Sequence, residues 1–380
     1  MKIDIGGLDI FFDVEGAKLV PDGPEMRERP TLLLLHGGPG FDHSHLRPAH
    51  SELADVAQCV FLDHRGNGRS GRATPETWNL DQWGDDVYEF CQALGIDKPI
   101  VLGLSFGGFV AQSYATRHPE HPAKLILSST AAIMRRERIY EMFERLGGAE
   151  ARAIAEAFWT DASDEAALGP YLETCFPLYN QTPQDPDMVA RNIMNADVLG
   201  DFFKPDGEGY RFDFSADLAK IQCPTLVYTG DMDPVTPPPL SEEIVAALPD
   251  GLAELRIFKG CGHGAERDDK DAVLKLVREF SGEGFRETEL YRLRGLVLLE
   301  NDPKEHSEPE KWFAKALETS RNQQSKSMEL RSAASLARLW RDQGRSEQAR
   351  DLLAPIHGWF SEGFDSPDLK EAKALLDELG

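Results

Sequence analysis

A serine flanked by glycines stands in the run Gly103-Leu104-Ser105-Phe106-Gly107. The apolar run 100–102 before it predicts a buried strand, and the apolar spacing after it, as far as His118, predicts a helix. A serine on so sharp a turn exposes its hydroxyl at the end of a sheet, and only glycine fits two places to either side. We therefore predict that Ser105 is a catalytic nucleophile. The alternative is an ordinary glycine-rich turn with an incidental serine.

A serine hydroxyl needs a base that is itself oriented by an acid. Two later runs that predict strands, 225–228 and 255–258, end in loops that offer these groups. Asp231 and Asp233 follow the first run, and His263 follows the second between two glycines. Because parallel strands bring their carboxyl ends to one edge of a sheet, these side chains are expected near Ser105. We assign His263 as the general base and Asp233 as its carboxylate partner, with Asp231 as the competing acid.

The oxyanion that forms on an attacked carbonyl needs backbone N–H donors in place beforehand. The residue after the nucleophile normally supplies one of them, so Phe106 is the first predicted donor. The second is expected from the loop His36-Gly-Gly-Pro-Gly40, which follows the apolar run 31–36. Gly38 is the best candidate there, and an ordinary turn is the alternative for this loop.

Short apolar runs separated by helical patterns make up the first 280 residues. Buried strands are predicted at 31–36, 60–62, 100–102, 125–127, 225–228 and 255–258. A helix is predicted at 80–94, an edge hairpin at 2–13, and a polar, proline-rich loop at 21–30. This alternation predicts an α/β fold in which helices cover both faces of a mainly parallel sheet.

The segment 131–211 has helical patterns and no apolar run of the strand type. We expect an α/β core in residues 1–130 and 212–282 that carries the site, with 131–211 inserted as a helical cap over it. Some aromatic residues of the cap could line a pocket, although such residues more often form the core of the cap itself. These residues are Phe158, Trp159, Phe176, Tyr179, Phe202 and Phe203.

Residues 285–380 have a different pattern, with one helix after another and no strand. One apolar face is predicted at Leu290, Leu293, Leu296 and Val297, and a second at 330–337, about forty residues later. Helix pairs repeated at this spacing indicate a short helical repeat domain. We expect it to serve self-association, the binding of a protein partner, or stabilisation.

The composition excludes several classes of function. Asp and Glu number 65 against 41 Lys and Arg, a formal net charge of −24, which disfavours nucleic acid as a partner. Five scattered cysteines without a C-x-x-C pair argue against a disulfide framework or a zinc site, and for a reducing compartment. No apolar stretch has the length of a membrane span, and the N-terminus does not resemble a signal peptide. We expect a cytoplasmic protein that uses neither a cofactor nor a metal.

Five motifs in order resemble the α/β-hydrolase superfamily over residues 1–282. They are His36-Gly-Gly-Pro-Gly40, Asp63-x-Arg65-Gly66-x-Gly68-x-Ser70, Gly103-x-Ser105-x-Gly107, Gly230-x-x-Asp233-x-x-x-Pro237 and Gly262-His263. The first two look most like the prolyl-iminopeptidase branch, in which the second motif is a structural turn. That branch usually carries Gly-Gly-Ser-Trp-Gly at the nucleophile, where this chain has Gly-Leu-Ser-Phe-Gly.

The resemblance implies a serine hydrolase that cleaves a small ester or amide through an acyl-enzyme. Its substrate would be a short peptide, or an ester or lactone if the protein is a carboxylesterase or lactonase. Peptidase relatives hold the substrate ammonium with cap carboxylates, for which this cap offers Glu156, Asp161, Glu165 and Glu173. Residues 285–380 resemble tetratricopeptide-type repeats, which leaves a non-catalytic, partner-binding protein as the alternative of another class.

Overall fold

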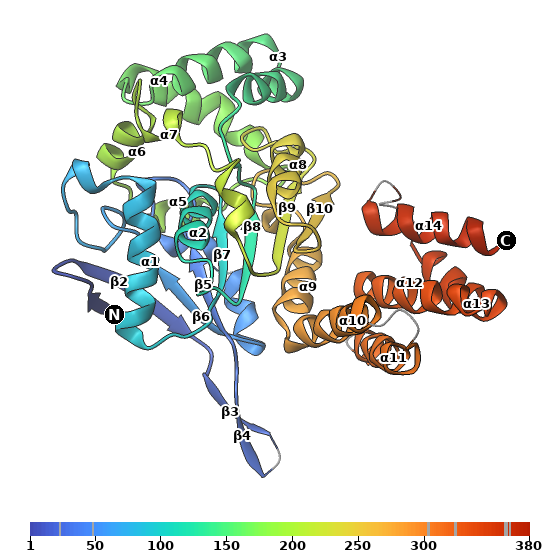
Figure 1. Ribbon diagram of the computed structural model, residues 1–380. Coiled ribbons are helices and arrows are strands. Elements are labelled where there is room, and N and C mark those ends of the chain that lie inside the picture. The colour runs from blue at the N-terminus through green and yellow to red at the C-terminus, as the bar shows by residue number, and fades with distance from the viewer. Residues whose placement is uncertain (23, 48, 302–304, 323–324, 361–363, 365) are drawn as a thin grey trace. The chain divides into compact units, whose positions relative to one another are not determined.

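The computed structural model describes residues 1–380 except 23, 48, 302–304, 323–324, 361–363 and 365. The chain divides into two compact units, Met1–Val277 and Arg278–Gly380 (Figure 1). Each unit is therefore described by itself.

Among the described residues, the first unit is built on an eight-stranded sheet in the order β1-β2-β6-β5-β7-β8-β9-β10. The edge strands β1 (Lys2–Asp4) and β2 (Asp9–Glu15) form the expected hairpin, and β2 pairs antiparallel with β6. All other neighbours in this sheet are parallel. These strands are β5 (Thr31–Leu35), β6 (Gln58–Leu62), β7 (Ile100–Leu104), β8 (Lys124–Ser128), β9 (Thr225–Gly230) and β10 (Ala253–Phe258).

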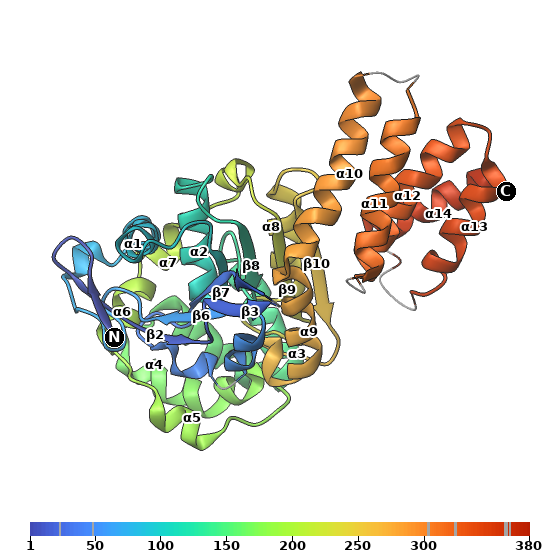
Figure 2. The same cartoon turned by 90° about the horizontal axis from the view of Figure 1, so that it is seen from below.

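Helices cover both faces of this sheet, which confirms the predicted α/β class. The helices α1 (Leu80–Leu94), α2 (Phe106–Arg117) and α8 (Pro238–Ala247) lie on one face, and α9 (Lys270–Ser281) lies on the other (Figures 1 and 2). Strands covered on both faces bury every side chain, and all residues of β5, β7, β8 and β9 are indeed buried. This is why the strands are visible in the sequence as unbroken apolar runs.

The segment 21–30, predicted as a loop, is instead part of a hairpin. Strand β3 (Leu19–Asp22) pairs antiparallel with β4 (Glu25–Glu28). The residues of β4 are exposed, so this strand lacks the alternation of apolar and polar residues by which strands are recognised. The loop prediction was wrong because the pairing depends on backbone hydrogen bonds and not on a buried face.

Helices without an intervening strand fill residues 136–211. They are α3 (Arg136–Thr160), α4 (Glu165–Pro170), η4 (Tyr171–Cys175), η5 (Phe176–Tyr179), α5 (Pro186–Arg191), α6 (Ala196–Phe203) and α7 (Glu208–Arg211). α3 is broken at Gly148, whose φ of 77° is not helical. This group of helices gathers beyond one end of the strands (Figure 1).

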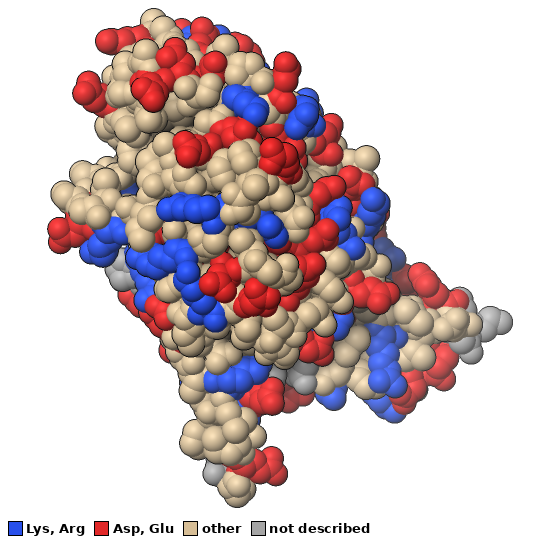
Figure 3. Space-filling model, turned by 90° about the vertical axis from the view of Figure 1, so that its left-hand side faces the viewer, with Lys and Arg blue, Asp and Glu red and all other residues tan. Residues whose placement is uncertain are grey.

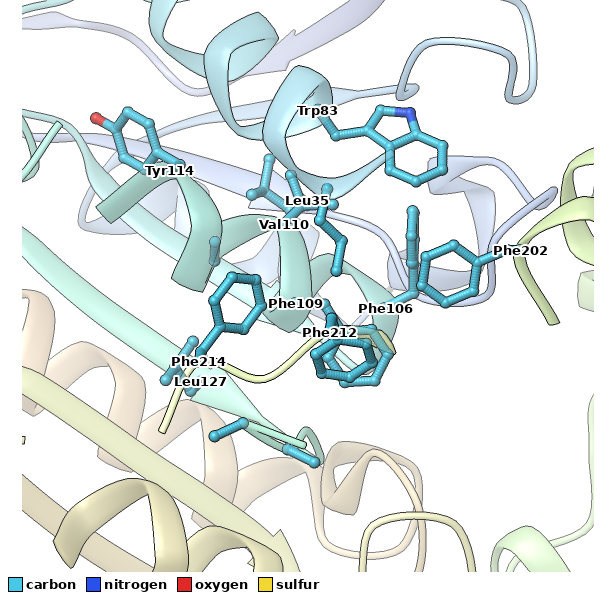
Figure 4. Packing of buried hydrophobic residues seen from close by; sticks show 14 of the residues in the cluster. Leu35, Trp83, Phe106, Phe109, Val110, Tyr114, Leu127, Phe202, Phe212 and Phe214 are labelled. Atoms are coloured by element: carbon cyan, nitrogen blue, oxygen red, sulfur yellow. The ribbon is translucent and has the colours of Figure 1, made fainter. Parts of the chain in front are cut away.

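Aromatic side chains form most of the core between these helices. Phe158, Trp159 and Phe203 are buried against one another, with ring centroids 5.4 and 5.0 Å apart for successive pairs. Phe202 reaches the core of the first unit, where its ring lies 5.3 Å from Phe106 and 5.9 Å from Trp83 (Figure 4). These aromatic residues therefore hold the predicted cap, residues 131–211, together and fasten it to α1 and α2.

Short 3₁₀ helices complete the first unit. They are η1 (His43–Leu46), η2 (His50–Asp55), η3 (Pro75–Thr77), η6 (Asp217–Lys220) and η7 (Ala265–Arg267).

Acidic and basic side chains are interspersed on the face that Figure 3 presents, with acidic ones over much of it. No described helix combines the length and the apolar character needed to cross a membrane.

The second unit, as far as it is described, is entirely helical. Its helices are α10 (Glu283–Asn301), α11 (Ser307–Asn322), α12 (Lys326–Asp342), α13 (Ser346–His357) and α14 (Pro367–Leu379). The expected apolar face of α12 is buried, with Leu330, Ala333 and Ala337 packed against Phe313 and Leu353.

The apolar face predicted on α10 is not a buried face. Leu290, Leu293 and Val297 are 63, 46 and 53% exposed, whereas Leu296 packs inward together with Leu299. Leucine and valine occur around much of this helix, so periodicity alone does not identify the face that meets a neighbour. The prediction was right for Leu296 and wrong for the other three residues.

Candidate active site

Ser105 stands between β7 and α2 in a strained backbone conformation, with φ of 54° and ψ of −117°. Its N–H donates to the Ser128 carbonyl at 2.9 Å, which ties the turn to the end of β8. A Cβ atom on Gly103 would lie 2.3 Å from the Gly107 carbonyl oxygen, and one on Gly107 would lie 2.1 Å from that of Leu35. The glycines are thus required because strand, helix and neighbouring strand approach too closely for a side chain.

The two predicted oxyanion donors belong to the residue after this serine and to a loop that passes beside it. Phe106 is the first residue of α2, where N–H groups have no partner within the helix. Gly38 has φ of +62°, and a Cβ on it would meet the Phe41 ring at 2.2 Å. A Cβ on the preceding residue, Gly37, would lie 3.2 Å from the Ser105 Cβ, so the 36–40 loop passes directly beside the serine. Among the described residues, neither the Phe106 nor the Gly38 N–H donates to another protein group.

Asp233 and His263 are brought together from the loops after β9 and β10. The His263 Nδ1 lies 3.0 Å from each carboxylate oxygen of Asp233. Asp233 is fully buried and also accepts hydrogen bonds from the Val235 and Thr236 N–H groups and from the Thr236 hydroxyl. Burial alone would raise the pKa of this carboxyl, but His263 and the hydrogen bonds from Thr236 outweigh it and keep the pKa below its usual value. Asp233 is therefore a buried carboxylate aimed at one nitrogen of His263.

Asp231, the competing acid, faces a different group. Its Oδ1 accepts the Gly260 N–H at 2.7 Å, and its Oδ2 lies 3.6 Å from the Lys259 Nζ. Asp231 thus ties the loop after β9 to the loop after β10. Tying loops together in this way is the structural role expected of an acid that is not the catalytic one.

The His263 loop and the serine turn meet at the end of β8. The Gly264 N–H donates to the Ser129 hydroxyl at 2.9 Å, and the Thr130 hydroxyl donates to the Ser105 carbonyl at 2.9 Å. A Cβ on Gly264 would lie 3.5 Å from the Leu104 side chain, next to the serine. The three loops that carry Ser105, Asp233 and His263 therefore lie side by side at one edge of the sheet.

A cap segment in which the sequence singles out only Tyr179 also holds the His263 loop. The Asn180 side-chain amide donates to the His263 carbonyl at 2.9 Å, and the Tyr179 ring lies 5.3 Å from the His263 ring. Asp268 joins both segments, since it accepts the Gly262 N–H and the Thr182 N–H, each at 2.7 Å. No local pattern marks Asn180, Thr182 or Asp268, because the contacts that join the cap to this loop link residues about eighty positions apart.

The cap carboxylates that could hold an ammonium group are otherwise engaged or exposed. Glu156 forms an ion pair with Arg152 at 2.7 Å, and Asp161 accepts from the Ser163 N–H and hydroxyl. Glu165 begins α4 and Glu173 lies in η4, and both are exposed. None of the four makes a described contact with the residues of the site.

The described residues include no group of three or more His, Cys, Asp or Glu placed to hold a metal ion. All five cysteines are free and buried. Burial raises the pKa of both Cys59 and Cys91 to about 12, so these thiols are protonated at neutral pH. The groups with the arrangement needed for nucleophilic chemistry are those around Ser105.

The fold and these motifs can be compared with known proteins. Residues 30–265 match the model of the α/β-hydrolase fold family. The proline iminopeptidase PfmaB of Pestalotiopsis fici is 32% identical over 283 residues, which cover 70% of this chain and 97% of that protein. The chain belongs to the α/β-hydrolase family. It falls in the branch of the proline iminopeptidases, as the 36–40 and 63–70 motifs indicate.

One further relative agrees with that placement, and one solved structure shares the fold of this hydrolase. The proline iminopeptidase of Lactobacillus helveticus is 29% identical over 299 residues, covering 73% of this chain and 96% of that one. The crystal structure of the proline iminopeptidase of Mycobacterium smegmatis shares the fold with a TM-score of 0.62 at 23% identity, over 74% of this chain and 97% of that one. The family match ends at residue 265, before the second unit begins.

Proposed function

We propose that this α/β hydrolase is a serine hydrolase that cleaves a small ester or amide with Ser105, His263 and Asp233. The observation that carries the proposal is the contact of His263 Nδ1 with both oxygens of buried Asp233, beside the strained turn of Ser105. The relatives named proline iminopeptidases support the same class of reaction. The reaction uses neither a cofactor nor a metal.

In the proposed mechanism, His263 Nδ1–H donates to Asp233, which leaves the Nε2 lone pair free to take the Ser105 proton. The Ser105 Oγ adds to the substrate carbonyl, and the Phe106 and Gly38 N–H groups stabilise the resulting oxyanion. His263 then gives its proton to the leaving alcohol or amine, and an acyl-enzyme remains. Water, deprotonated by His263, adds to the acyl group and releases the carboxylic acid and free Ser105.

A fluorophosphonate probe and the variant Ser105→Ala test this proposal. The wild type is expected to be labelled once, at Ser105, and to hydrolyse a short-chain aryl ester. Ser105→Ala is expected to lose labelling and to lower kcat on the order of 10⁶-fold, since triad members act as a unit. A Ser105→Ala protein that keeps the wild-type turnover contradicts the proposal.

The substrate class divides the proposal in two. The relatives favour release of an N-terminal proline, whereas the engaged or exposed cap carboxylates favour an ester or lactone that needs no ammonium site. We rank the carboxylesterase or lactonase second. Parallel kcat/KM values for a prolyl arylamide, a short-chain aryl ester and a lactone decide between them, and preference for the prolyl arylamide establishes the aminopeptidase.

The helical unit 285–380 is proposed to bind a protein partner or a second copy of the chain. Its position outside the family match at 30–265 supports a separate role, and a tetratricopeptide-like origin stays a prediction. If the protein is instead a non-catalytic, partner-binding protein that works through this unit, Ser105 must be chemically inert. Five free cysteines support a reducing, cytoplasmic setting. Light scattering of the full chain tests self-association, for which a monomer at all concentrations is the contrary result.

A further inference from the structure

The imidazole rings of His36 and His45 both form hydrogen bonds with the backbone of Gly37, the residue that precedes Gly38. The Gly37 N–H donates to His45 Nε2 at 3.2 Å, and the Gly37 carbonyl lies 3.0 Å from His36 Nδ1. His45 comes from η1, eight residues further along the chain. Both sides of this one residue are therefore held by side chains.

The partners of the two rings determine their protonation. His45 Nε2 faces an N–H and must accept, while its Nδ1 lies 2.8 Å from the Asp42 carbonyl and must donate. His36 follows the same rule, since its Nδ1 donates to Gly37 and its Nε2 accepts the His64 N–H at 3.2 Å. Both rings are thus neutral and carry their proton on Nδ1.

Because the peptide bond is planar, the hydrogen bonds that hold Gly37 also restrict the orientation of the Gly38 N–H. In a trans peptide the Gly37 carbonyl and the Gly38 N–H point in opposite directions. With the carbonyl held by His36 and the N–H of Gly37 held by His45, the peptide that ends in the Gly38 N–H has little freedom to rotate. The direction of that N–H is therefore determined by two rings outside the 37–40 glycine loop.

We propose that His45 is a positioning residue of the oxyanion hole, which acts by accepting the Gly37 N–H and so directs the Gly38 N–H at the reacting carbonyl oxygen. The inference rests on the proposed function, because only a reaction at Ser105 uses that N–H. His45 itself touches neither substrate nor Ser105 in this role. For this role the His45 ring must be neutral, with an unprotonated Nε2 that can accept a hydrogen bond.

The surroundings of His45 keep the ring in that state. Burial, with His36 and His50 as neighbouring titratable rings, lowers the pKa of His45 to about 3, although Asp42 opposes the shift. A protonated His45 would turn a second N–H toward that of Gly37. At neutral pH the ring therefore remains an acceptor.

Kinetics of His45 variants test the role. His45→Leu removes the acceptor and is expected to lower kcat for an aryl ester about 10- to 100-fold, with KM nearly unchanged. His45→Gln, whose amide oxygen accepts the same N–H, is expected to recover most of kcat. The matched control is His50→Leu, because His50 is a buried ring that bonds the Leu46 carbonyl and has no described contact with the 36–40 loop. Wild-type kcat in His45→Leu, or equal losses in His45→Leu and His50→Leu, overturns the proposal.

Nitrogen-15 NMR of the histidine rings supplies a readout independent of activity. The His45 ring of the wild type is expected as the neutral Nδ1–H form, which is the minor form of free histidine, and a proton on Nε2 overturns the inference. An inert wild type with unlabelled Ser105 overturns the proposed function instead. An active wild type with the Nδ1–H ring and an unimpaired His45→Leu variant overturns only the role of His45.

Discussion

The backbone N–H of His263 donates to the carbonyl of Tyr179 at 2.6 Å. One residue belongs to the loop after β10 and the other to the cap, so the proposed general base is held by the insertion above it. A Cβ on Gly262 would lie 1.9 Å from that same carbonyl oxygen, which explains a glycine at this position. The cap segment 179–182 is therefore part of the framework of the site.

Asp268 offers a test of this framework. Replacement by alanine removes the acceptor of the Gly262 and Thr182 N–H groups, so the His263 loop loses part of its connection to the cap, while the hydrogen bond from the His263 N–H to the Tyr179 carbonyl remains. We expect kcat to fall about 10- to 100-fold, as for other residues that orient a catalytic group. The control is Asp269→Ala, which removes only a bond to Ala272 at the start of α9. Equal activity of the two variants contradicts the framework role.

The assignment of the acid predicts different effects at two nearby aspartates. Asp233→Asn presents an amide N–H to His263 Nδ1, so the ring proton moves to Nε2 and the base is lost. We expect kcat to fall about 10⁴-fold, while Asp231→Asn stays within about threefold. Circular dichroism checks that both variants fold. A larger loss in Asp231→Asn would identify Asp231 as the acid instead.

Gly107 is expected to tolerate no side chain. The methyl group of Gly107→Ala would lie 2.1 Å from the Leu35 carbonyl oxygen, which belongs to a buried strand and has no room to shift. We expect a loss of about 3 kcal/mol or more in the free energy of unfolding, measured by urea titration. Gly169→Ala is the control, since a methyl there has no neighbour within 4 Å. Similar stability of the two variants is the contrary result.

The buried pair of Asp63 and His43 predicts how stability depends on pH. Burial alone would raise the pKa of Asp63, but hydrogen bonds from His43, at 2.6 Å, and Arg69 help to lower it to about 2, against an ordinary 3.8. A depressed pKa stabilises the fold above pH 4, and this contribution is lost as the pH falls toward 2.

Asp63→Asn removes this titration. The gap in unfolding free energy between wild type and variant is expected to shrink by roughly 2 kcal/mol from pH 5 to pH 2. Urea titrations at several pH values measure the gap. Asp250→Asn, which removes one exposed negative charge, controls for the change in net charge. A gap that is constant over this range contradicts the prediction.

The local sequence was sufficient to predict an element wherever the residues of that short segment explain its structure by themselves. Strands covered on both faces must be apolar throughout, so β5, β7, β8 and β9 were recognisable as runs. Helix α1 shows the same for helices, because Asn79 caps its start and Gly95, with φ of 64°, ends it. The turn at Ser105 partly belongs to this class, since Gly103 is required by its own helix, whereas Gly107 is required by the neighbouring strand β5.

Where a segment depends on what lies opposite, the sequence was not sufficient. The leucines of α10 have the spacing of a buried face, yet Leu290 and Leu293 are exposed. The hairpin of β3 and β4 has no buried face, and the sequence predicts a loop there. Both failures have one cause, because periodicity reports which residues are apolar and not which of them find a neighbour.

The sequence by itself determined the α/β class, the turn that presents Ser105, and the two loops that supply Asp233 and His263. Only the tertiary structure decided that Asp233 rather than Asp231 faces His263, that Tyr179 and Asp268 hold the His263 loop, and that His45 accepts the Gly37 N–H. The first set follows from neighbours along the chain. The second consists of hydrogen bonds whose direction depends on folded loops, and short-range patterns contain no record of such pairings.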